Sequence, residues 1–389
     1  MEWKEVRLGD IVSIKSGLAY KGAFIGKGEN ILLGMGCVSF KDKFLFSGAR
    51  PYEADCDDKY CVEPGDIVLA TRQQSDNLPI LAMPAIIPPS LKAKKIIYGT
   101  NLYKVENHSE VTNDFLFWQL KTPNYIDYIS SVKTGSVVRM VTKKNVEDYV
   151  FRCPPKEVRD RISKLLWGLD RKIELNNKIN ADLEEMAQAI FKNWLSECSD
   201  DVTIGELSLN VTNYEKTDAE NVVLINSSDV TEGYFNHHNY SPNKNLKGHF
   251  KKRFQKGDIL YSQVRPRNRH WAYCNFDAND YLASTQLMII RNNPSLITSI
   301  LLYQYIISDN VWKEFTLKTE TRSGTFPQGN YEDLSQIRVP YNSDVEGISN
   351  QLETLYAKMF MLEKENSRLS LLRDTLLPRL MSGELEVPE

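Results

Sequence analysis

The stretch RISKLLWGLDRKIELNNKINADLEEMAQAIFKNWL, residues 161–195, decides the architecture of this chain. Its apolar residues recur at spacings of three and four with one glycine and no proline, which predicts a long helix over 156–195. A heptad register gives the helix a narrow apolar seam, which is typical of a helix paired with one partner helix. The seam residues are Leu166, Leu169, Ile173, Leu183 and Ile190.

A second stretch, 342–381, repeats this pattern in a register that aligns Leu352 with Leu166, and it supplies the partner helix. Its seam residues are Leu352, Leu355, Met359, Leu362, Leu369 and Leu376. The first helix leads away from one segment and the second returns from the next, so we expect an antiparallel coiled coil. Forty residues at about 1.5 Å each give a length of roughly 60 Å. Asn180 and Asn366 also fall in the seam, where they either fix the register or are tolerated near solvent.

The segments that precede the two helices also repeat one another in the same order. The matching pieces are VRLGDIV (6–12) with VTIGELS (202–208), PGDIVLAT (64–71) with KGDILYSQ (256–263), KTGSVVRMV (133–141) with RSGTFPQGN (322–330), and NVEDYVFRCPP (145–155) with NYEDLSQIRVP (330–340). The last pair aligns Asn145 with Asn330, and its prolines predict the end of a strand. The glycine-containing loop has a four-residue insertion in its first copy.

The sequence therefore predicts an α+β protein with two repeated mixed α/β domains. Each domain has one internal helix, at about 112–130 and 296–315, and is followed by one long helix of the coiled coil. We expect pseudo-two-fold symmetry, and 389 residues suit two hydrophobic cores. The predicted segments are 1–155, 156–199, 200–341 and 342–389.

Composition narrows the class of protein. The chain is 42% hydrophobic and 25% charged, and none of its apolar runs approaches the ~18 residues of a membrane helix. The start MEWKEVRLGD lacks the apolar core of a secretory signal, so we expect a cytoplasmic protein with no membrane partner. The six cysteines are scattered, and two of the five histidines, His237 and His238, are expected in a solvated turn. No spacing fits a metal site, so we predict no bound metal.

Together these features resemble the specificity subunits of type I restriction-modification systems. The resemblance covers essentially the whole chain. It is carried by the start RLGDIV, the repeated GDI strand, the TGS and SGT loops, the helix RISKLLWGLDRKIELN and the terminal LLRDTLLPRLMSGELEV. The helix openings PPKEVRDRI and VPYNSDVEGI depart from the family pattern, because they lack the Glu-Gln pair expected after the prolines.

The resemblance implies two target recognition domains that each read one half of a bipartite DNA site, with the paired helices setting the gap between the halves. Members of this family perform no chemistry and hold no cofactor. They bind double-stranded DNA and two modification subunits, which methylate adenine from S-adenosylmethionine. In complete systems they also bind restriction subunits, which use ATP and Mg²⁺.

The distribution of charge also points to nucleic acid. The net charge is only −3, but residues 244–291 carry ten Lys or Arg and three Asp or Glu. Lysine can neutralise phosphates, whereas Arg can bind guanine, and Asn or Gln can bind adenine, through two hydrogen bonds. Alternatively, the lysines protect a solvated strand edge, and ordinary turns explain the loop glycines.

The candidate DNA-binding residues lie in five short stretches. They are Arg72, Gln73, Gln74, Ser75 and Asn77; Lys133, Ser136, Arg139, Lys143 and Lys144; Lys251, Lys252 and Arg253; Gln263, Arg265, Arg267, Asn268, Arg269 and His270; and Arg322, Thr325 and Gln328. Because these loops differ most between the two copies, we expect an asymmetric DNA site.

Two other classes of function compete with DNA recognition. A methyltransferase or nuclease would need a glycine-rich cofactor loop or a catalytic tetrapeptide, and the sequences IPPS, CPPK and GAFIGKGEN do not fit either. A coiled-coil scaffold that binds only protein would use its basic loops for solubility. Such a scaffold would show no sequence preference for DNA and little salt dependence.

Overall fold

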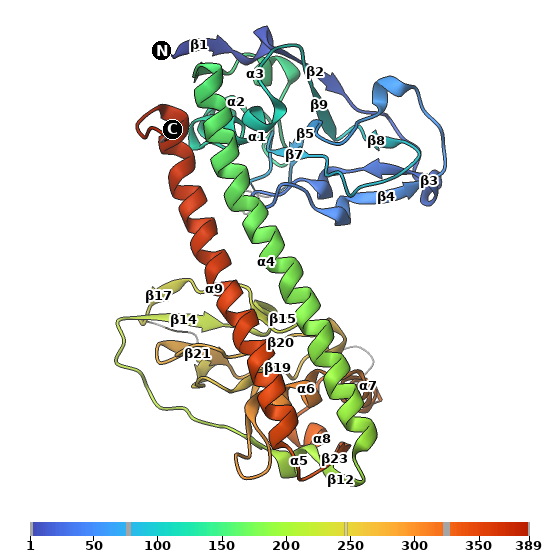
Figure 1. Ribbon diagram of the computed structural model, residues 1–389, viewed down its shortest axis with the longest axis vertical. Helices are drawn as coiled ribbons and strands as arrows, with labels where there is room; N and C mark the ends of the chain where they lie inside the picture. Colours follow the sequence, from blue (N-terminus) through green and yellow to red (C-terminus); the bar gives the residue numbers. More distant parts are fainter. Residues whose placement is uncertain (1–2, 75–78, 245, 247, 322–326, 388–389) are drawn as a thin grey trace. The chain divides into compact units, whose positions relative to one another are not determined.

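The computed structural model describes residues 3–74, 79–244, 246, 248–321 and 327–387. It divides the chain into two compact units (Figure 1). Unit 1 comprises Met1–Glu174 and Asn366–Glu389, and unit 2 comprises Leu175–Glu365. Each unit therefore contains one globular region and one part of each long helix, whereas the sequence assigned those helices to segments of their own.

Unit 1 is built on two small sheets. Strands β2 (Val12–Ser16), β9 (Leu102–Asn107), β5 (Ile67–Ala70) and β7 (Pro84–Ile86) form an antiparallel sheet in that order. The second sheet has the order β4 (Ala49–Tyr52), β3 (Ile25–Leu33) and β8 (Ile96–Tyr98), with β3 and β8 parallel. Strand β1 (Lys4–Arg7) pairs with β11 (Val150–Cys153), and β6 (Arg72–Gln73) pairs with β10 (Arg139–Met140).

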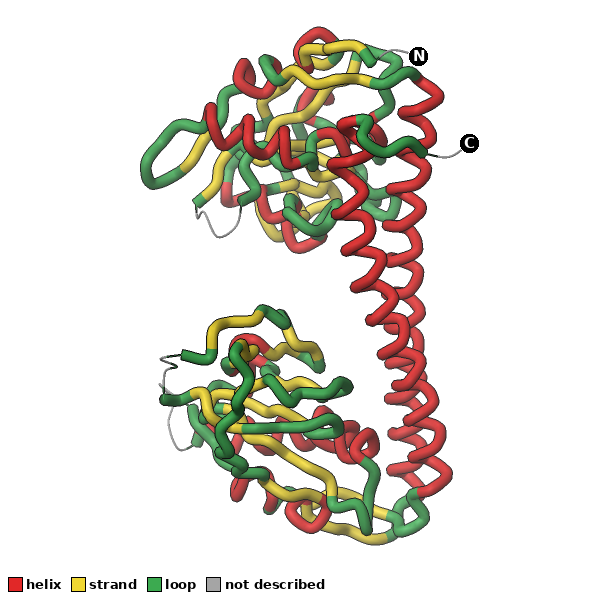
Figure 2. The backbone as a smooth tube through the Cα atoms, turned by 90° about the vertical axis from the view of Figure 1, so that its left-hand side faces the viewer, coloured by secondary structure: helices red, strands yellow, loops and turns green. Residues whose placement is uncertain are grey.

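Unit 2 repeats this plan (Figure 2). Its first sheet has the order β13 (Ser208–Asn210), β22 (Leu287–Asn292), β19 (Ile259–Ser262) and β20 (Trp271–Tyr273). Its second has the order β17 (Tyr240–Pro242), β14 (Asn221–Ile225), β21 (Tyr281–Ser284) and β18 (Phe250–Lys252), with β14 and β21 parallel. Strand β12 (Asp200–Thr203) pairs with β23 (Arg338–Tyr341), and β15 (Val230–Thr231) pairs with β16 (Tyr234–Phe235). The predicted repeat and α+β class are confirmed.

The repeated Gly-Asp pair has the same local role in both units. Asp66 accepts a hydrogen bond from the backbone N–H of Glu63 at 2.9 Å, and Asp258 accepts one from Gln255 at 2.8 Å. The preceding glycines, Gly65 and Gly257, have φ angles of +90° and +93°, a region that glycine enters without steric cost. The motif thus closes a tight turn that leads into the central strand, β5 or β19.

The internal helix predicted in each copy is in fact a pair of helices. In unit 1, α1 (Asn113–Gln119) ends before α2 (Pro123–Val132), whose first residue is proline and whose N-cap is Thr122. In unit 2, α6 (Ser299–Ile307) gives way to α7 (Asp309–Glu320) at the N-cap Ser308. At each break a side-chain cap satisfies a backbone N–H and starts a new helix. The sequence did not reveal these breaks, because the apolar periodicity continues across them.

The short helices α3 (Lys143–Glu147) and α8 (Tyr331–Ser335) correct the alignment of Asn145 with Asn330 that the sequence repeat suggested. Asn330 is the N-cap of α8, whereas the N-cap of α3 is Thr142, and Asn145 lies inside that helix. The structure thus aligns Asn330 with Thr142, and the shared Asn-x-Glu-Asp letters fall at different helix positions. Strand β23 also continues through Pro340 to Tyr341, so that proline does not end the strand.

The two long helices are α4 (Lys156–Glu197) and α9 (Glu346–Ser382), drawn green and red in Figure 1. Helix α9 starts later than predicted, at Glu346 and not at Asn342, because the side chain of Asn342 accepts a hydrogen bond from the N–H of Asp344 and forms a turn there. Unit 2 also contains α5 (Ile204–Leu207).

The antiparallel pairing of α4 and α9 is confirmed. Within unit 2, the amide of Asn176 bonds to Glu365 at 2.8 Å, and the amide of Asn180 bonds to the carbonyl of Met359 at 3.3 Å. The partner number falls along α9 as the position along α4 rises. Asn180 is 7% exposed, so it is a buried seam residue and not a residue near solvent. The pseudo-two-fold relation between the two units stays a prediction.

All predicted seam residues are buried or half-buried, and Leu166 and Leu352 are completely buried. The expectation of a narrow seam facing a single partner is nevertheless wrong, because each helix also packs on the globular region of its unit. In unit 2, the ring of Phe191 meets Tyr305 edge to face at 5.0 Å, and the hydroxyl of Tyr356 accepts a hydrogen bond from Gln304 at 2.5 Å. The helices therefore form part of both hydrophobic cores.

Candidate nucleic-acid interface

In unit 1, the two loops predicted to contact DNA are joined to each other. Arg139 pairs with Gln73 and Met140 with Arg72 across β6 and β10, which are far apart in sequence. The N–H of Val141 also donates to the carbonyl of Thr71 at 3.4 Å. The backbone therefore combines the stretches TRQQ and KTGSVVRMV into one surface element.

Unit 2 joins its corresponding loops at the equivalent place. Val264 forms an antiparallel bridge with Gln328. The N–H of Gly329 donates to Gln263, and that of Arg265 donates to Pro327, both at 2.9 Å. Both units thus hold one loop that follows the central strand against one loop that precedes a short helix. A backbone pairing that recurs at the equivalent position is what a pair of similar binding sites requires.

The side chains of unit 1 differ in what they offer to a ligand. Arg72, Gln74, Ser136, Lys143 and Lys144 are exposed, and Lys133 and Arg139 are half-buried. Gln73 is the exception, because it is buried and its side-chain oxygen accepts a hydrogen bond from the N–H of Leu81 at 3.2 Å. Its predicted role as a base reader is wrong in this conformation, and it supports the loop instead.

The Arg-rich loop of unit 2 folds around a short 3₁₀ helix, Pro266–Asn268. Arg265 and Arg269 flank this helix with φ angles of +49° and +52°, a left-handed conformation that is uncommon for residues other than glycine. Backbone strain of this kind persists only where surrounding contacts impose it, and it is concentrated at functional sites. Asn268 and Arg265 are exposed on this turn.

Two arginines of this loop are bound by the protein itself. Arg267 forms an ion pair with Glu320, with Nη2 2.6 Å from the carboxylate. The guanidinium of Arg269 lies 4.3 Å from the ring of Trp312, and Nη2 is 3.4 Å from Asp309. The stacking on Trp312 fixes the direction of Arg269, so this side chain holds the loop on α7 and has little freedom to search for a base.

The side chains at the edges of this loop are partly covered. His270 is half-buried, with Nδ1 2.8 Å from the carbonyl of Val230, and Gln263 is also half-buried. The histidine turn at His237 and His238 is at the surface as predicted, because His238 is exposed. Nδ1 of His238 also lies 2.7 Å from the hydroxyl of Tyr281, and its ring packs on Phe276. Partial burial lowers the pKa of His238 below its usual range.

The basic strand β18 contributes less than its sequence suggests. Lys252 is 5% exposed, its ammonium donates to the carbonyl of Leu287 at 2.7 Å, and burial lowers its pKa. The prediction that Lys252 contacts phosphate is therefore wrong. Arg253 donates to the carbonyl of Asn279 at 2.5 Å, whereas Lys251 is exposed beside the ring of Tyr214.

Four predicted residues, Ser75, Asn77, Arg322 and Thr325, lie outside the described residues. Sequence reasoning missed the side chains that hold the Arg-rich loop, namely Trp312, Asp309 and Glu320. These residues lie on α7, far along the chain from their arginine partners, and no local signal in the sequence links the two.

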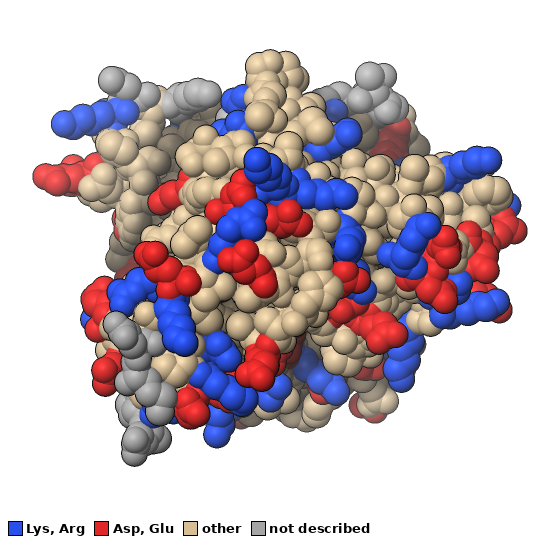
Figure 3. All heavy atoms as spheres, turned by 90° about the horizontal axis from the view of Figure 1, so that it is seen from above, with Lys and Arg blue, Asp and Glu red and all other residues tan. Residues whose placement is uncertain are grey.

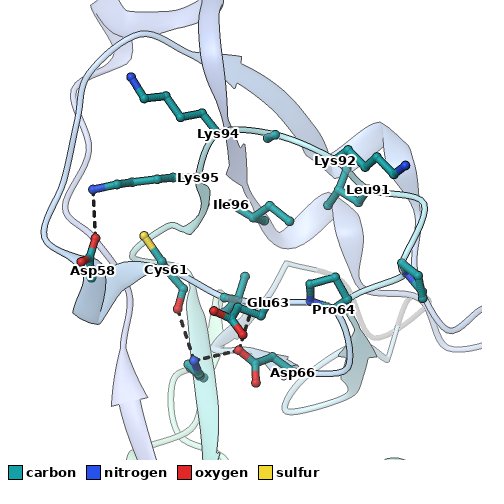
Figure 4. Close-up of a pocket in the computed structure, with 14 residues that line it drawn as sticks. Asp58, Cys61, Glu63, Pro64, Asp66, Leu91, Lys92, Lys94, Lys95 and Ile96 are labelled. Atoms are coloured by element: carbon teal, nitrogen blue, oxygen red, sulfur yellow. Dashed lines mark hydrogen bonds and ion pairs between the residues drawn. The ribbon is translucent and has the colours of Figure 1, made fainter.

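A cavity of about 910 Å³ in unit 1 is also lined by lysines but is a weaker candidate (Figure 4). Lys95 lies 2.9 Å from both Asp55 and Asp58, whose hydrogen bonds raise its pKa, and Lys104 lies 2.8 Å from Asp66. Because carboxylates already neutralise Lys95 and Lys104, these two lysines are poor candidates for binding an anion.

On the face drawn in Figure 3, Lys and Arg are interspersed with Asp and Glu. In the part of the chain that the structure describes, no group of three His, Cys, Asp or Glu side chains could hold a metal ion. Among those same residues, no helix combines the length and hydropathy needed to cross a membrane.

Comparison with known proteins shows what this chain is similar to. Residues 1–185 match the model of the type I restriction modification DNA specificity domain. The specificity subunit of the HindI type I restriction enzyme of Haemophilus influenzae is 35% identical over 136 residues. This alignment covers 35% of the present chain and 30% of that subunit. The chain is similar to the specificity subunits of type I restriction-modification systems. The resemblance inferred from the sequence motifs is thereby confirmed.

Two further type I specificity subunits are similar over longer stretches. The specificity subunit of the MjaIX type I restriction enzyme of Methanocaldococcus jannaschii is 21% identical over 309 residues, or 72% of this chain and 70% of that subunit. The type I system S subunit of M. genitalium has a similar fold, with a TM-score of 0.59 and 14% identity over 98% of this chain and 96% of that chain.

Proposed function

We propose that this chain is a specificity subunit that reads an asymmetric, bipartite site in double-stranded DNA. Unit 1 reads one half-site and unit 2 the other. The joined loops in each unit carry the observation that best supports this function, because the pairing of β6 with β10 in unit 1 recurs as the bridge between Val264 and Gln328 in unit 2. Duplicated sites with different side chains suit a target whose two halves differ.

The side chains on these loops divide the work of recognition. Exposed lysines such as Lys143 and Lys144 suit phosphate contacts, which give affinity without sequence preference. Exposed Arg72, Gln74 and Asn268 have the donors and acceptors that read base edges. Arg267 and Arg269 act as positioning residues, because Glu320 and Trp312 hold them.

The proposed role in the cell is to direct chemistry that other subunits perform. The chain itself would hold no cofactor and catalyse no reaction. Two modification subunits would methylate adenine in the half-sites with S-adenosylmethionine, and restriction subunits with ATP and Mg²⁺ would complete a cleaving complex. We propose the paired helices α4 and α9 as the surface on which the modification subunits dock, in the cytoplasm and without a membrane.

The test is selection of bound duplexes from a random DNA library by the chain co-purified with its modification subunits. We expect a single enriched motif with two unlike halves and a fixed gap, and binding that weakens steeply as salt rises. A protein-only scaffold would enrich no motif and show little salt dependence, and that result would refute the proposed function.

A further inference from the structure

One loop of unit 1, between Thr134 and Met140, exposes apolar side chains that none of the roles above uses. Val137 has 82% of its surface exposed, the highest value among the large apolar residues described, and Val138 and Met140 have 37% and 41%. Single exposed apolar residues are ordinary on protein surfaces. Three of them within four positions of one loop are less ordinary, and exposed apolar residues that gather together mark interaction sites.

The loop is braced from within. Thr134 and Met140 exchange two backbone hydrogen bonds of 2.9 Å, and Nη1 of Arg139 donates to the carbonyl of Gly135 at 2.6 Å. Gly135 has a φ of +89°, and a Cβ atom there would come within 2.2 Å of the carbonyl oxygen of Val138. This architecture fixes the backbone that carries Val137 before any partner binds, which lowers the entropy cost of binding.

The surroundings of the loop define the chemistry of its partner. Residues 133–144 contain four cationic side chains and no acidic one. Met140, at the end of the loop, pairs with Arg72 of β6, so the loop that carries Val137 is joined to the strand that carries a proposed base reader. A polyanion that also presents an apolar group fits this combination. In duplex DNA, the C5-methyl group of thymine in the major groove is such a group.

We propose that Val137 makes an apolar contact with the C5-methyl group of one thymine in the half-site read by unit 1. This inference rests on the proposed function and adds a specificity-determining residue to it. Arg139 is then a positioning residue, because it holds the loop through Gly135. The half-site of unit 1 would be read by one apolar contact in addition to polar ones.

The experiment replaces thymine with uracil, one position at a time, in the selected duplex, which removes only the methyl group. Binding by the complex of this chain with its modification subunits is measured by fluorescence anisotropy. We expect one position in the unit 1 half-site to weaken binding by about fourfold, the factor equivalent to about 0.8 kcal/mol for one buried carbon. In the Val137→Ala variant, uracil at that position should cost less than about 1.5-fold.

A matched control is Val150→Ala, because Val150 is another half-exposed valine of unit 1, with 52% of its surface exposed, on β11 outside the loop. This variant should keep the full uracil penalty. Equal uracil penalties in the wild type and in Val137→Ala would overturn the inference. The absence of any uracil-sensitive position would overturn it as well. In both cases the proposed function would stand as long as the complex still bound DNA with sequence preference. Loss of all sequence preference in the wild-type complex would instead refute the proposed function itself.

Discussion

Replacing Asp170 with asparagine should destabilise unit 1 through a nearly buried ion-pair cluster. The Asp170 carboxylate, 9% exposed, lies 2.8 Å from Nη1 of Arg373 on α9 and 3.1 Å from Nζ of Lys43. The Arg373 and Lys43 side chains are themselves only 12% and 22% exposed. The variant Asp170→Asn keeps the shape of the side chain but removes the charge that both cations share.

The size of the effect follows from what each cation retains. Removing one partner of a buried ion pair costs about 3–5 kcal/mol. Arg373 keeps Asp374, which is 64% exposed, and Lys43 keeps Glu174, which is 57% exposed, so we expect a loss of about 2–3 kcal/mol in the free energy of unfolding. For a unit of this size, that loss lowers the melting temperature by roughly 4–12 °C.

Scanning calorimetry of the full chain measures this change in the transition assigned to unit 1. The matched control is Glu174→Gln, which removes an exposed partner of Lys43 at 2.7 Å and should cost less than about 1 kcal/mol. The double variant Asp170→Asn with Arg373→Met should be more stable than the sum of the single effects predicts, because the two residues interact directly. Two results would refute this explanation of how α4 and α9 are held together. One is that the stability losses of the two single variants simply add in the double variant. The other is that Asp170→Asn is as stable as Glu174→Gln.

Three other predictions concern DNA binding and pH. Replacing Lys143 and Lys144 with alanine should lower the slope of log affinity against log salt concentration by about 1.8, close to 0.9 per phosphate contact, and an unchanged slope would exclude both residues from the backbone contact. Burial raises the pKa of Glu363 to about 7, so its folded state favours the protonated form, and stability is lost as pH rises from about 4.5 to 7. Glu363→Gln should therefore gain roughly 1–3 kcal/mol at pH 8 and nothing at pH 4.5, and a denaturant titration showing equal gains at both pH values would contradict this. Removing four residues in register from α4 and α9 shortens each helix by about 6 Å. The gap between the two half-sites should then shrink by one or two base pairs, at about 3.4 Å each. An unchanged gap in the selected DNA motif would show that the helices do not set the gap.

The sequence predicted the parts of this fold that depend on periodicity. Heptad spacing placed Leu166 and Leu352 in a buried antiparallel seam, and the repeated Gly-Asp pair marked the turn before each central strand. Periodicity alone did not reveal that Phe191 and Tyr356 face the globular region, because an apolar residue beside a seam looks the same whichever neighbour covers it.

The candidate site stays a prediction, but the structure shows which of its features the sequence could indicate. Composition drew attention to the loops around Arg72 and Arg265, whereas the pairing of each with a second loop depends on tertiary structure. Whether a cation faces solvent also depends on neighbours far along the chain. Lys252 is buried against Leu287, and Arg269 stacks on Trp312, yet both look like ordinary surface cations in the sequence.

The central claim, that each unit reads its own half of the target, is tested most directly by methylome sequencing after exchange of one unit. Residues 1–155 are replaced by the corresponding segment of a known type I specificity subunit, and the modified adenines are mapped in cells that carry the modification subunits. The account predicts that one half-site changes, while the other half-site and the gap stay as in the wild type. A change in both halves, or a change in neither, would contradict it.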